Sequence, residues 1–240
     1  MLLGIWQWLS SLRLAPSYLF PGPMDVFRSL REMAADGTLL ISIRLSMGRM
    51  IIGYSISIVG GLAIGLASAR SRLFKETVGS LIMALQSLPS VCWLPLALIW
   101  FGINEMSIMV VVILGAIFSI AIATESAIRN IPPIYQKVGR VLGARGFVFA
   151  RDILFFAALP ELIGGLKIGW TFAWRSLMAA ELIRADVNGV ARILQTGREF
   201  NDIAMMLAGM IVILVIGLTV DLAVFGTLER KIRRRWGLEK

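Results

Sequence analysis

The 240-residue sequence contains no histidine and a single cysteine, Cys92. Without histidine the chain lacks the commonest general base, the commonest metal ligand and the side chain that titrates near neutral pH. One cysteine excludes a disulfide framework and a thiolate metal site within the chain. No carboxylates pair at helical spacing inside an apolar run, and the phosphate-loop pattern GxxxxGK[ST] does not occur. We therefore expect no enzyme, no metal, no cofactor and no phosphate-loop ATP site in this chain.

Charged residues are also scarce. They make up 16% of the chain, whereas hydrophobic residues make up 58% and the mean hydropathy is +0.80. Soluble domains carry roughly 25% charged residues, so this composition indicates a membrane protein. The candidate spans are Met1–Leu12, Leu39–Ala69, Val78–Phe101, Ser107–Ala123, Glu161–Ile183 and Ile203–Phe225. A bilayer crossing takes about 20 mostly apolar residues, a length that every segment except the first meets or nearly meets.

The first apolar segment, Met1–Leu12, is open to three interpretations: a short helix, a truncated start of a span, or an interfacial anchor. A signal peptide is disfavoured because no basic region precedes the segment and no small-residue cleavage site follows it. The resulting prediction is an all-α integral membrane protein with about six transmembrane helices.

The net charge of +9 is distributed unevenly between the loops. If both termini are cytoplasmic, fourteen basic residues lie inside and six outside. The inside residues are Arg70, Arg72, Lys75, Arg129, Lys137, Arg140, Arg145, Arg151, Arg230, Lys231, Arg233, Arg234, Arg235 and Lys240; the outside residues are Arg13, Arg28, Arg31, Arg184, Arg192 and Arg198. This excess is the positive-inside bias of inner-membrane proteins, and the basic tail predicts contact with anionic lipid. No recognition motif accompanies the basic residues, so nucleic acid is not an expected partner.

Proline and glycine divide the chain without separating domains, so we predict a single transmembrane domain over residues 1–240. Met24–Ala35 has the apolar spacing of a short amphipathic helix. Arg44 and Arg49 lie early in Leu39–Ala69, where we expect both to extend outward to water. Pro89 and Pro95 interrupt the third span, which a membrane helix tolerates beside other helices or a water-filled cavity.

A basic segment, Tyr135–Pro160, lies between two long apolar runs. Apolar residues at helical spacing predict a short helix over Ile134–Leu142, followed by a glycine turn at Gly143 and Gly146. A second short helix is predicted over Phe147–Phe156, ending before the corner Ala157–Pro160. Such a knob suits a groove on a soluble partner, and it equally suits the lipid surface as a basic amphipathic hairpin. The residues alone leave both alternatives open.

The same segment resembles the cytoplasmic EAA loop of permease subunits in ABC importers. Gly143, with Ile153 ten residues later, sets the register; Lys137, Val138 and Gly139 stand where the family has EAA, and Phe155 and Phe156 replace the following LP. The runs FPGPMDVFRSL, LQSLPSVCWLPLALIWFGINEMSIMVVV and AALPELIGGLKIGWTFAWRSLMAAELI are similar to the subfamily that imports nitrate, taurine, alkanesulfonates and bicarbonate. The similarity extends from about Pro21 to the C-terminus, and the family's first span is usually longer than Met1–Leu12.

This resemblance implies a type I importer permease in the inner membrane, with its coupling loop at about residues 134–157. It implies four kinds of partner: a second copy of the chain, cytoplasmic ATPase subunits that hydrolyse ATP, a periplasmic or lipoprotein binding protein, and the lipid bilayer. The residues expected to meet the ATPase are Lys137, Val138, Gly139, Arg140, Leu142, Gly143, Ala144 and Arg145. The alternative is a stand-alone channel or secondary transporter in which the basic loop is a lipid anchor.

Lys167 and Arg175 are the candidates for a substrate path, because ionisable residues inside a span are functional candidates by default. They are eight residues apart on one helix face and suit an anion; the alternative is that they pair with carboxylates or extend to the interface. We interpret Gln86, Ser87 and Ser90 as kinked-helix packing, and Trp93, Trp100, Trp170 and Trp174 as core or interfacial anchors. The small residues Gly164, Gly165, Gly169 and Ala173 predict close approach of two copies.

Overall fold

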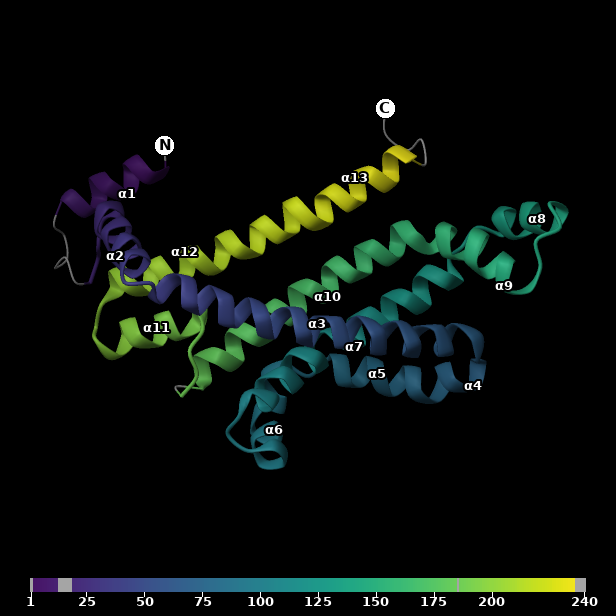
Figure 1. Cartoon of the computed structure of the whole chain (residues 1–240), viewed down its shortest axis with the longest axis horizontal. Coiled ribbons are helices and arrows are strands. Elements are labelled where there is room, and N and C mark those ends of the chain that lie inside the picture. Colours follow the sequence, from purple (N-terminus) through teal and green to yellow (C-terminus); the bar gives the residue numbers. More distant parts are fainter. Residues whose placement is uncertain (1, 13–18, 185, 236–240) are drawn as a thin grey trace. The chain divides into compact units, whose positions relative to one another are not determined.

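The computed structural model describes residues 2–12, 19–184 and 186–235, and every regular element in these residues is a helix (Figure 1). Met1, Arg13 and Lys240, named above, lie outside these residues, as do Ala185 and the side chain of Arg235. The chain divides into two compact units. The first comprises Met1–Ile51 with Leu177–Leu218, and the second comprises Ile52–Ser176 with Thr219–Lys240. The single domain expected over residues 1–240 stays a prediction.

Four helical stretches in the described residues are long and apolar enough to cross a membrane. They are Thr38–Arg70, Glu105–Arg129, Arg151–Ile183 and Ile203–Arg234. The bent pair Arg72–Gln86 and Ser90–Phe101 makes a fifth if its two arms form one span. These five agree with the five longer predicted segments. The first predicted segment is the helix α1 (Leu2–Ser11), whose 10 residues fall short of the about 20 that a crossing takes.

The first unit is held together by the apolar face of α2 (Pro23–Ala35), the amphipathic helix that the sequence predicts. Val26 and Met33 of this helix are buried against Ile193 of α11 (Val190–Glu199) and Ala208 of α12 (Ile203–Thr219). Pro23 occupies the first turn, where its missing N–H leaves no bond unmade.

The second unit is built around α7 (Glu105–Arg129), whose Val111, Val112, Ala116 and Ile120 are almost completely buried. The long helix α3 (Thr38–Arg70) packs closely against α7 at a glycine, Gly65. A Cβ atom on Gly65 would lie 2.5 Å from the carbonyl oxygen of Ala121 and 2.5 Å from the Cβ of Thr124. Only glycine leaves space for this backbone-to-backbone approach, which is how small residues join membrane helices.

The small residues of α10 (Phe155–Ile183) also pack inside the chain, which corrects their assignment to the contact between two copies. A Cβ on Gly165 would lie 2.2 Å from the Cβ of Ala123, and one on Gly169 would lie 2.6 Å from Ile120, both on α7. Ala173 is fully buried. Small residues show that a helix is approached closely but do not show by what, and here the neighbour is α7. Gly164, with nothing within 4 Å of its added Cβ, is the exception.

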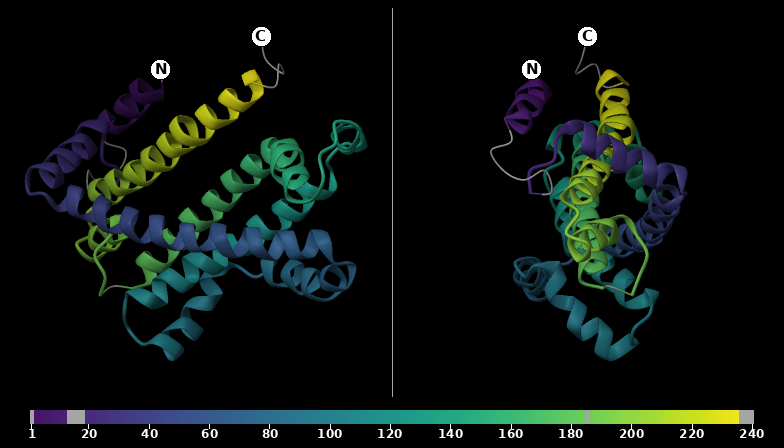
Figure 2. Two further views of the ribbon diagram at one scale, coloured as in Figure 1. Left: turned by 45° about the vertical axis from the view of Figure 1, so that its right-hand side comes forward. Right: turned by 90° about the vertical axis from the view of Figure 1, so that its left-hand side faces the viewer.

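The third predicted span is broken at Pro89, as predicted, but the predicted interruption at Pro95 is wrong. After α4 (Arg72–Phe74) and a π-turn at Lys75–Gly79, helix α5 (Ser80–Gln86) ends before Pro89. A 3₁₀ turn, Ser90–Trp93, leads into α6 (Leu94–Phe101), and the two arms are bent by 100° (Figures 1 and 2). Pro95 lies in the first turn of α6, so it begins this helix and does not interrupt it.

The basic segment begins with α8 (Pro133–Val141) and α9 (Gly146–Phe149), followed by a π-turn at Ala150–Leu154. The predicted end of the second helix before Ala157–Pro160 is wrong, because the chain continues directly into α10 with Pro160 inside the helix. A proline removes one backbone hydrogen bond, a loss that membrane helices accommodate through neighbouring groups and local π adjustments. The last span likewise contains a π-turn, Val220–Phe225, between α12 and the basic helix α13 (Gly226–Arg235).

Candidate functional site: the basic knob and the polar groups of the spans

Helices α8 and α9 form a compact knob through a glycine turn. Gly143 and Gly146 have φ values of 78° and 57°, in the left-handed region that favours glycine. The turn is closed by backbone hydrogen bonds: the N–H of Gly143 donates to the carbonyl of Arg140 over 3.1 Å, and that of Ala144 donates to Gly139 over 3.0 Å. The predicted turn at these two glycines is confirmed.

Gly139 fixes how closely the two arms of the knob approach. It is buried, and an added Cβ would lie 2.3 Å from the Cδ1 of Ile153 and 2.8 Å from the Cε2 of Phe149. This glycine stands at the last position of the EAA pattern. Glycine stands here in place of the alanine of that pattern, and the bulky side chains of Ile153 and Phe149 fill the space that the methyl group of alanine would occupy.

The outer face of the knob is apolar and basic. Val141 and Leu142 are 86% and 78% exposed, and Lys137, Arg140 and Arg145 are exposed around them. An open groove of about 410 Å³ runs along α8; the residues that line it are Ile134, Tyr135, Val138, Gly139, Leu142, Asp152, Ile153, Phe156 and Ala157. Exposed apolar surface beside charge is typical of an interaction surface.

The two substrate-path candidates differ in their surroundings. Lys167 is partly buried and forms an ion pair of 3.2 Å with Asp221, which lies in the π-turn of the last span. Arg175 is exposed, and its side chain has no ion pair or hydrogen bond among the described residues. Among the described residues, the structure therefore shows the alternative of a carboxylate partner for Lys167 and not for Arg175. Asp221 was not anticipated, although an acid within the apolar run Ile203–Phe225 was the available signal.

Aromatic rings pack around Trp170, which lies three residues after Lys167 on α10. Trp170 lies edge-on to Tyr54 with ring centroids 5.4 Å apart, and it is stacked with Trp174 at 6.4 Å. Phe225 approaches Trp170 at 6.3 Å. Trp170 and Trp174 are buried, which confirms their interpretation as core residues, whereas Trp100 is 61% exposed.

The polar residues at the bend of the third span bond within the chain. Ser90 shares a 2.6 Å hydrogen bond with Ser176 of α10, and the side-chain amide of Gln86 donates to Ser119 of α7 over 3.1 Å. The hydroxyl of Ser87 donates to the carbonyl of Ala84. These contacts confirm the interpretation of the cluster as kinked-helix packing.

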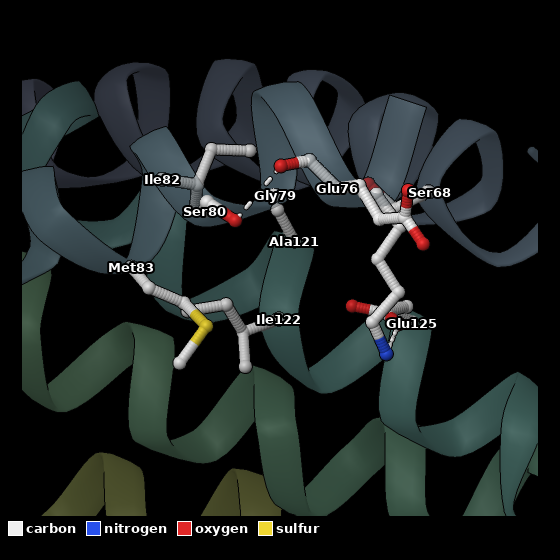
Figure 3. Close-up of a pocket in the computed structure, with 10 residues that line it drawn as sticks. Ser68, Glu76, Gly79, Ser80, Ile82, Met83, Ala121, Ile122 and Glu125 are labelled. Atoms are coloured by element: carbon white, nitrogen blue, oxygen red, sulfur yellow. Dashed lines mark hydrogen bonds and ion pairs between the residues drawn. The ribbon is translucent and has the colours of Figure 1, made fainter. Parts of the chain in front are cut away.

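A small pocket lies between α3, the segment Lys75–Met83 and α7 (Figure 3). Its volume is about 180 Å³, below the roughly 300–1,000 Å³ of small-molecule sites. Of its two carboxylates, Glu125 pairs with Lys75 at 2.6 Å and with Arg129 at 3.0 Å, and Glu76 pairs with Arg72 at 2.7 Å. The pocket is therefore a packing void whose carboxylates are neutralised by ion pairs, and we assign no ligand to it.

The most buried charges lie in the first unit. Glu181 of α10 is fully buried, and Arg49 of α3, 5% exposed, donates to its Oε1 over 2.7 Å. The expectation that Arg49 extends outward is wrong, because a buried carboxylate on another helix offers it a partner; Arg44 is exposed as expected. Beyond the end of α10, Arg184 donates to Asp186 and holds the pKa of this carboxyl below its usual range. The Asp186 carboxyl is therefore ionised at neutral pH.

Comparison with known proteins identifies the family. Residues 57–234 match the family of binding-protein-dependent transport system inner membrane components. The chain belongs to this family. This permease is 28% identical over 231 residues to an aliphatic sulfonates transport permease of Bacillus subtilis, a match that covers 96% of this chain and 83% of the relative. It is also 28% identical over 239 residues to the taurine transport system permease of Escherichia coli, a match that covers 98% of this chain and 85% of the relative. A nitrate import permease of Synechocystis is 28% identical over 229 residues, which cover 92% of this chain and 82% of that relative.

The fold of the permease is similar to that in a crystal structure of an amino acid ABC transporter with histidines. The TM-score is 0.69 at 15% identity, and the match covers 84% of the permease and 97% of that chain. At this identity the likeness shows the fold alone. Together with the family match it confirms the predicted all-α, type I ABC importer permease fold, so the permease is a multi-pass membrane protein.

Proposed function

We propose that the permease forms, with a second copy of itself, the path by which a small anion such as a sulfonate, taurine, nitrate or bicarbonate enters the cell. A substrate-binding protein delivers the anion from outside, and separate cytoplasmic ATPase subunits hydrolyse ATP. The permease itself carries out no catalysis. The names of the sulfonate, taurine and nitrate relatives support this substrate class.

The observation that carries the proposal is the knob formed by α8 and α9. Its turn is fixed by Gly143, its arms are closely packed at Gly139, and its exposed apolar face has no partner in the described chain. An apolar helix face flanked by basic side chains fits a groove on a soluble subunit. In this arrangement, closure of two ATPase subunits moves the two knobs and repacks the spans between two states.

The proposal is tested with the complex purified from the native host through a tag on the permease. We expect an ATP-binding-cassette ATPase to co-purify, and proteoliposomes with ATP inside to accumulate one of four labelled probes: taurine, an alkanesulfonate, nitrate or bicarbonate. A stand-alone channel or secondary transporter would move solute when the permease is reconstituted alone and without ATP. Solute movement under that condition would contradict the proposal.

Topology gives a separate prediction: the knob is cytoplasmic and the α11 region external. Cysteines replacing Arg145 and Arg198, both exposed, are expected to react with an impermeant maleimide from opposite sides of the membrane. The background is Cys92→Ser, because Cys92 is exposed. Gly189 is unsuitable for labelling, since an added Cβ would lie 2.3 Å from the carboxylate of Glu181. Labelling of both cysteines from one side would refute this topology.

Arg175 is the candidate anion contact, and Arg175→Ala is expected to raise the KM for uptake roughly 10-fold, the value of one hydrogen bond to a charged group. Its side chain is exposed and has no partner in the described chain, so its removal costs no internal contact. Arg44→Ala, an exposed arginine on α3, is the matched control. Equal uptake kinetics in the two variants would exclude Arg175 from the path.

Lys167 needs a double variant, because it already pairs with Asp221. If Lys167 contributes only this ion pair, removal of both side chains restores the activity that Lys167→Ala loses. If Lys167 also attracts the anion, uptake stays low in the double variant. We expect the second outcome in uptake assays on complexes of equal yield.

A further inference from the structure

Glu181, Arg49 and Ser46 form a buried cluster that the proposed transport path does not use. Ser46 and Glu181 are fully buried, and Arg49 is 5% exposed. The hydroxyl of Ser46 lies 2.7 Å and 2.8 Å from the two carboxylate oxygens of Glu181, and Arg49 donates to one of them over 2.7 Å. The cluster joins α3 to α10 within the first unit.

The same cluster also holds the start of the helix α11. The backbone N–H of Val190 donates to Ser46 over 2.9 Å, and that of Ala191 donates to Glu181 over 3.3 Å. Arg49 donates to the carbonyl of Asn188 over 2.7 Å. The first N–H groups of a helix have no partner within the helix, so these side chains act as its cap from two other helices.

Gly189 shows how tightly α11 lies on this cap. An added Cβ at Gly189 would lie 2.3 Å from one carboxylate oxygen of Glu181 and 2.6 Å from the other. Below the cap, Val190, Ala191 and Ile193 are buried. Helix α11 is therefore fixed both by its apolar face and by a charged group at its first turn.

A buried ion pair is weak grounds for stability, since apolar residues of similar volume often stabilise as well. What the cluster of Glu181, Arg49 and Ser46 supplies is orientation: its hydrogen bonds have defined directions, and they end on three backbone groups of one segment. α10 matters in addition because it follows directly on the knob, as part of one continuous helical stretch, Arg151–Ile183. Glu181 lies two residues before the end of that stretch.

We propose that Glu181, with Arg49 and Ser46, is a positioning residue that locks α11 to α3 and α10, so that α11 follows the movement of α10. The inference rests on the proposed function: with this lock, α11 is the external element that responds to the nucleotide state of the ATPase. Solute transfer from the binding protein then depends on Glu181, although this residue contacts neither solute nor ATP.

The test is hydrogen exchange, followed by mass spectrometry, on the purified complex in nanodiscs with and without ATP and vanadate. In the parent complex, nucleotide and vanadate are expected to change the exchange of peptides covering residues 186–200. In Glu181→Gln, exchange at Val190 and Ala191 is expected to rise at least about 10-fold, because the cap is weakened. The nucleotide response of this region should be lost while ATP hydrolysis without binding protein continues.

A second pair of variants leaves both charges in place. Gly189→Ala displaces the Glu181 carboxylate and is expected to reproduce the loss of the nucleotide response. Gly48→Ala is the control, because Gly48 is next to Arg49 in the chain and nothing lies within 4 Å of its added Cβ; it should behave as the parent. A parent complex whose 186–200 peptides ignore nucleotide, or variants that keep the full response, would overturn the inference. A parent complex that shows no ATP-driven uptake would instead refute the proposed function, so the two failures are distinguishable.

Discussion

Gly143→Asp is expected to abolish ATP-driven uptake while the permease still inserts into the membrane and reaches normal levels. The backbone of Gly143 is at φ 78°, where another residue costs about 1–2 kcal/mol, equivalent to roughly 10-fold in a binding constant. The new carboxylate also lies beside the exposed apolar residues Val141 and Leu142, where burial against a partner is costly.

The chain provides a matched control for this variant in Gly37. Its φ is 81°, and nothing lies within 4 Å of an added Cβ, as at Gly143. Gly37→Asp therefore carries the same backbone strain and the same charge outside the knob. We expect it to retain the ATPase on co-purification and to retain uptake. If both variants transport like the parent, or both fail alike, the knob is not the coupling element.

Gly65→Leu is expected to have the largest effect on folding. Its Cβ would lie 2.5 Å from the carbonyl oxygen of Ala121, a backbone atom that cannot move aside without shifting α7. Overpacking a core costs about 1–3 kcal/mol and sometimes more, and here the obstacle is backbone. We expect a low yield of monodisperse protein in detergent and a lowered melting temperature.

Gly48→Leu tests whether the position, and not the loss of a helix glycine, is responsible. Gly48 lies on the same helix, α3, with nothing within 4 Å of an added Cβ. This variant should purify like the parent and melt at a similar temperature. Similar melting of the Gly65 and Gly48 variants would show that α3 and α7 do not approach closely at Gly65.

The sequence predicts those parts of the fold that depend on local chemistry. The apolar length of Glu105–Arg129 gives a span, Pro89 gives the break between α5 and α6, and Gly143 gives the turn of the knob. Each of these follows from residues that are neighbours in the chain. The local pattern leaves the role of the knob open between a docking element and a lipid anchor, and only the resemblance implies that it is the coupling loop.

The pairing of charges inside the spans could not be predicted in this way. Arg49 and Glu181 are 132 residues apart in the chain, and several acids were equally available to Arg49 as partners. Which acid pairs with Arg49 depends on which helices are adjacent and on the depth of each residue along its helix. The hydropathy of the sequence predicts neither of these. For the same reason, the glycines of α10 were assigned to a second copy before α7 was seen to occupy the space beside them.

The reversed charge at Lys137 has a consequence for the specificity of assembly. The EAA pattern that this loop resembles begins with an acid, whereas this permease has an exposed ammonium group at that position of α8. An ATPase whose groove is matched to an acid would meet a like charge there, which favours a different partner surface. If the proposed coupling loop meets the ATPase at Lys137, this permease would not share its ATPase with an importer whose permease carries the acid.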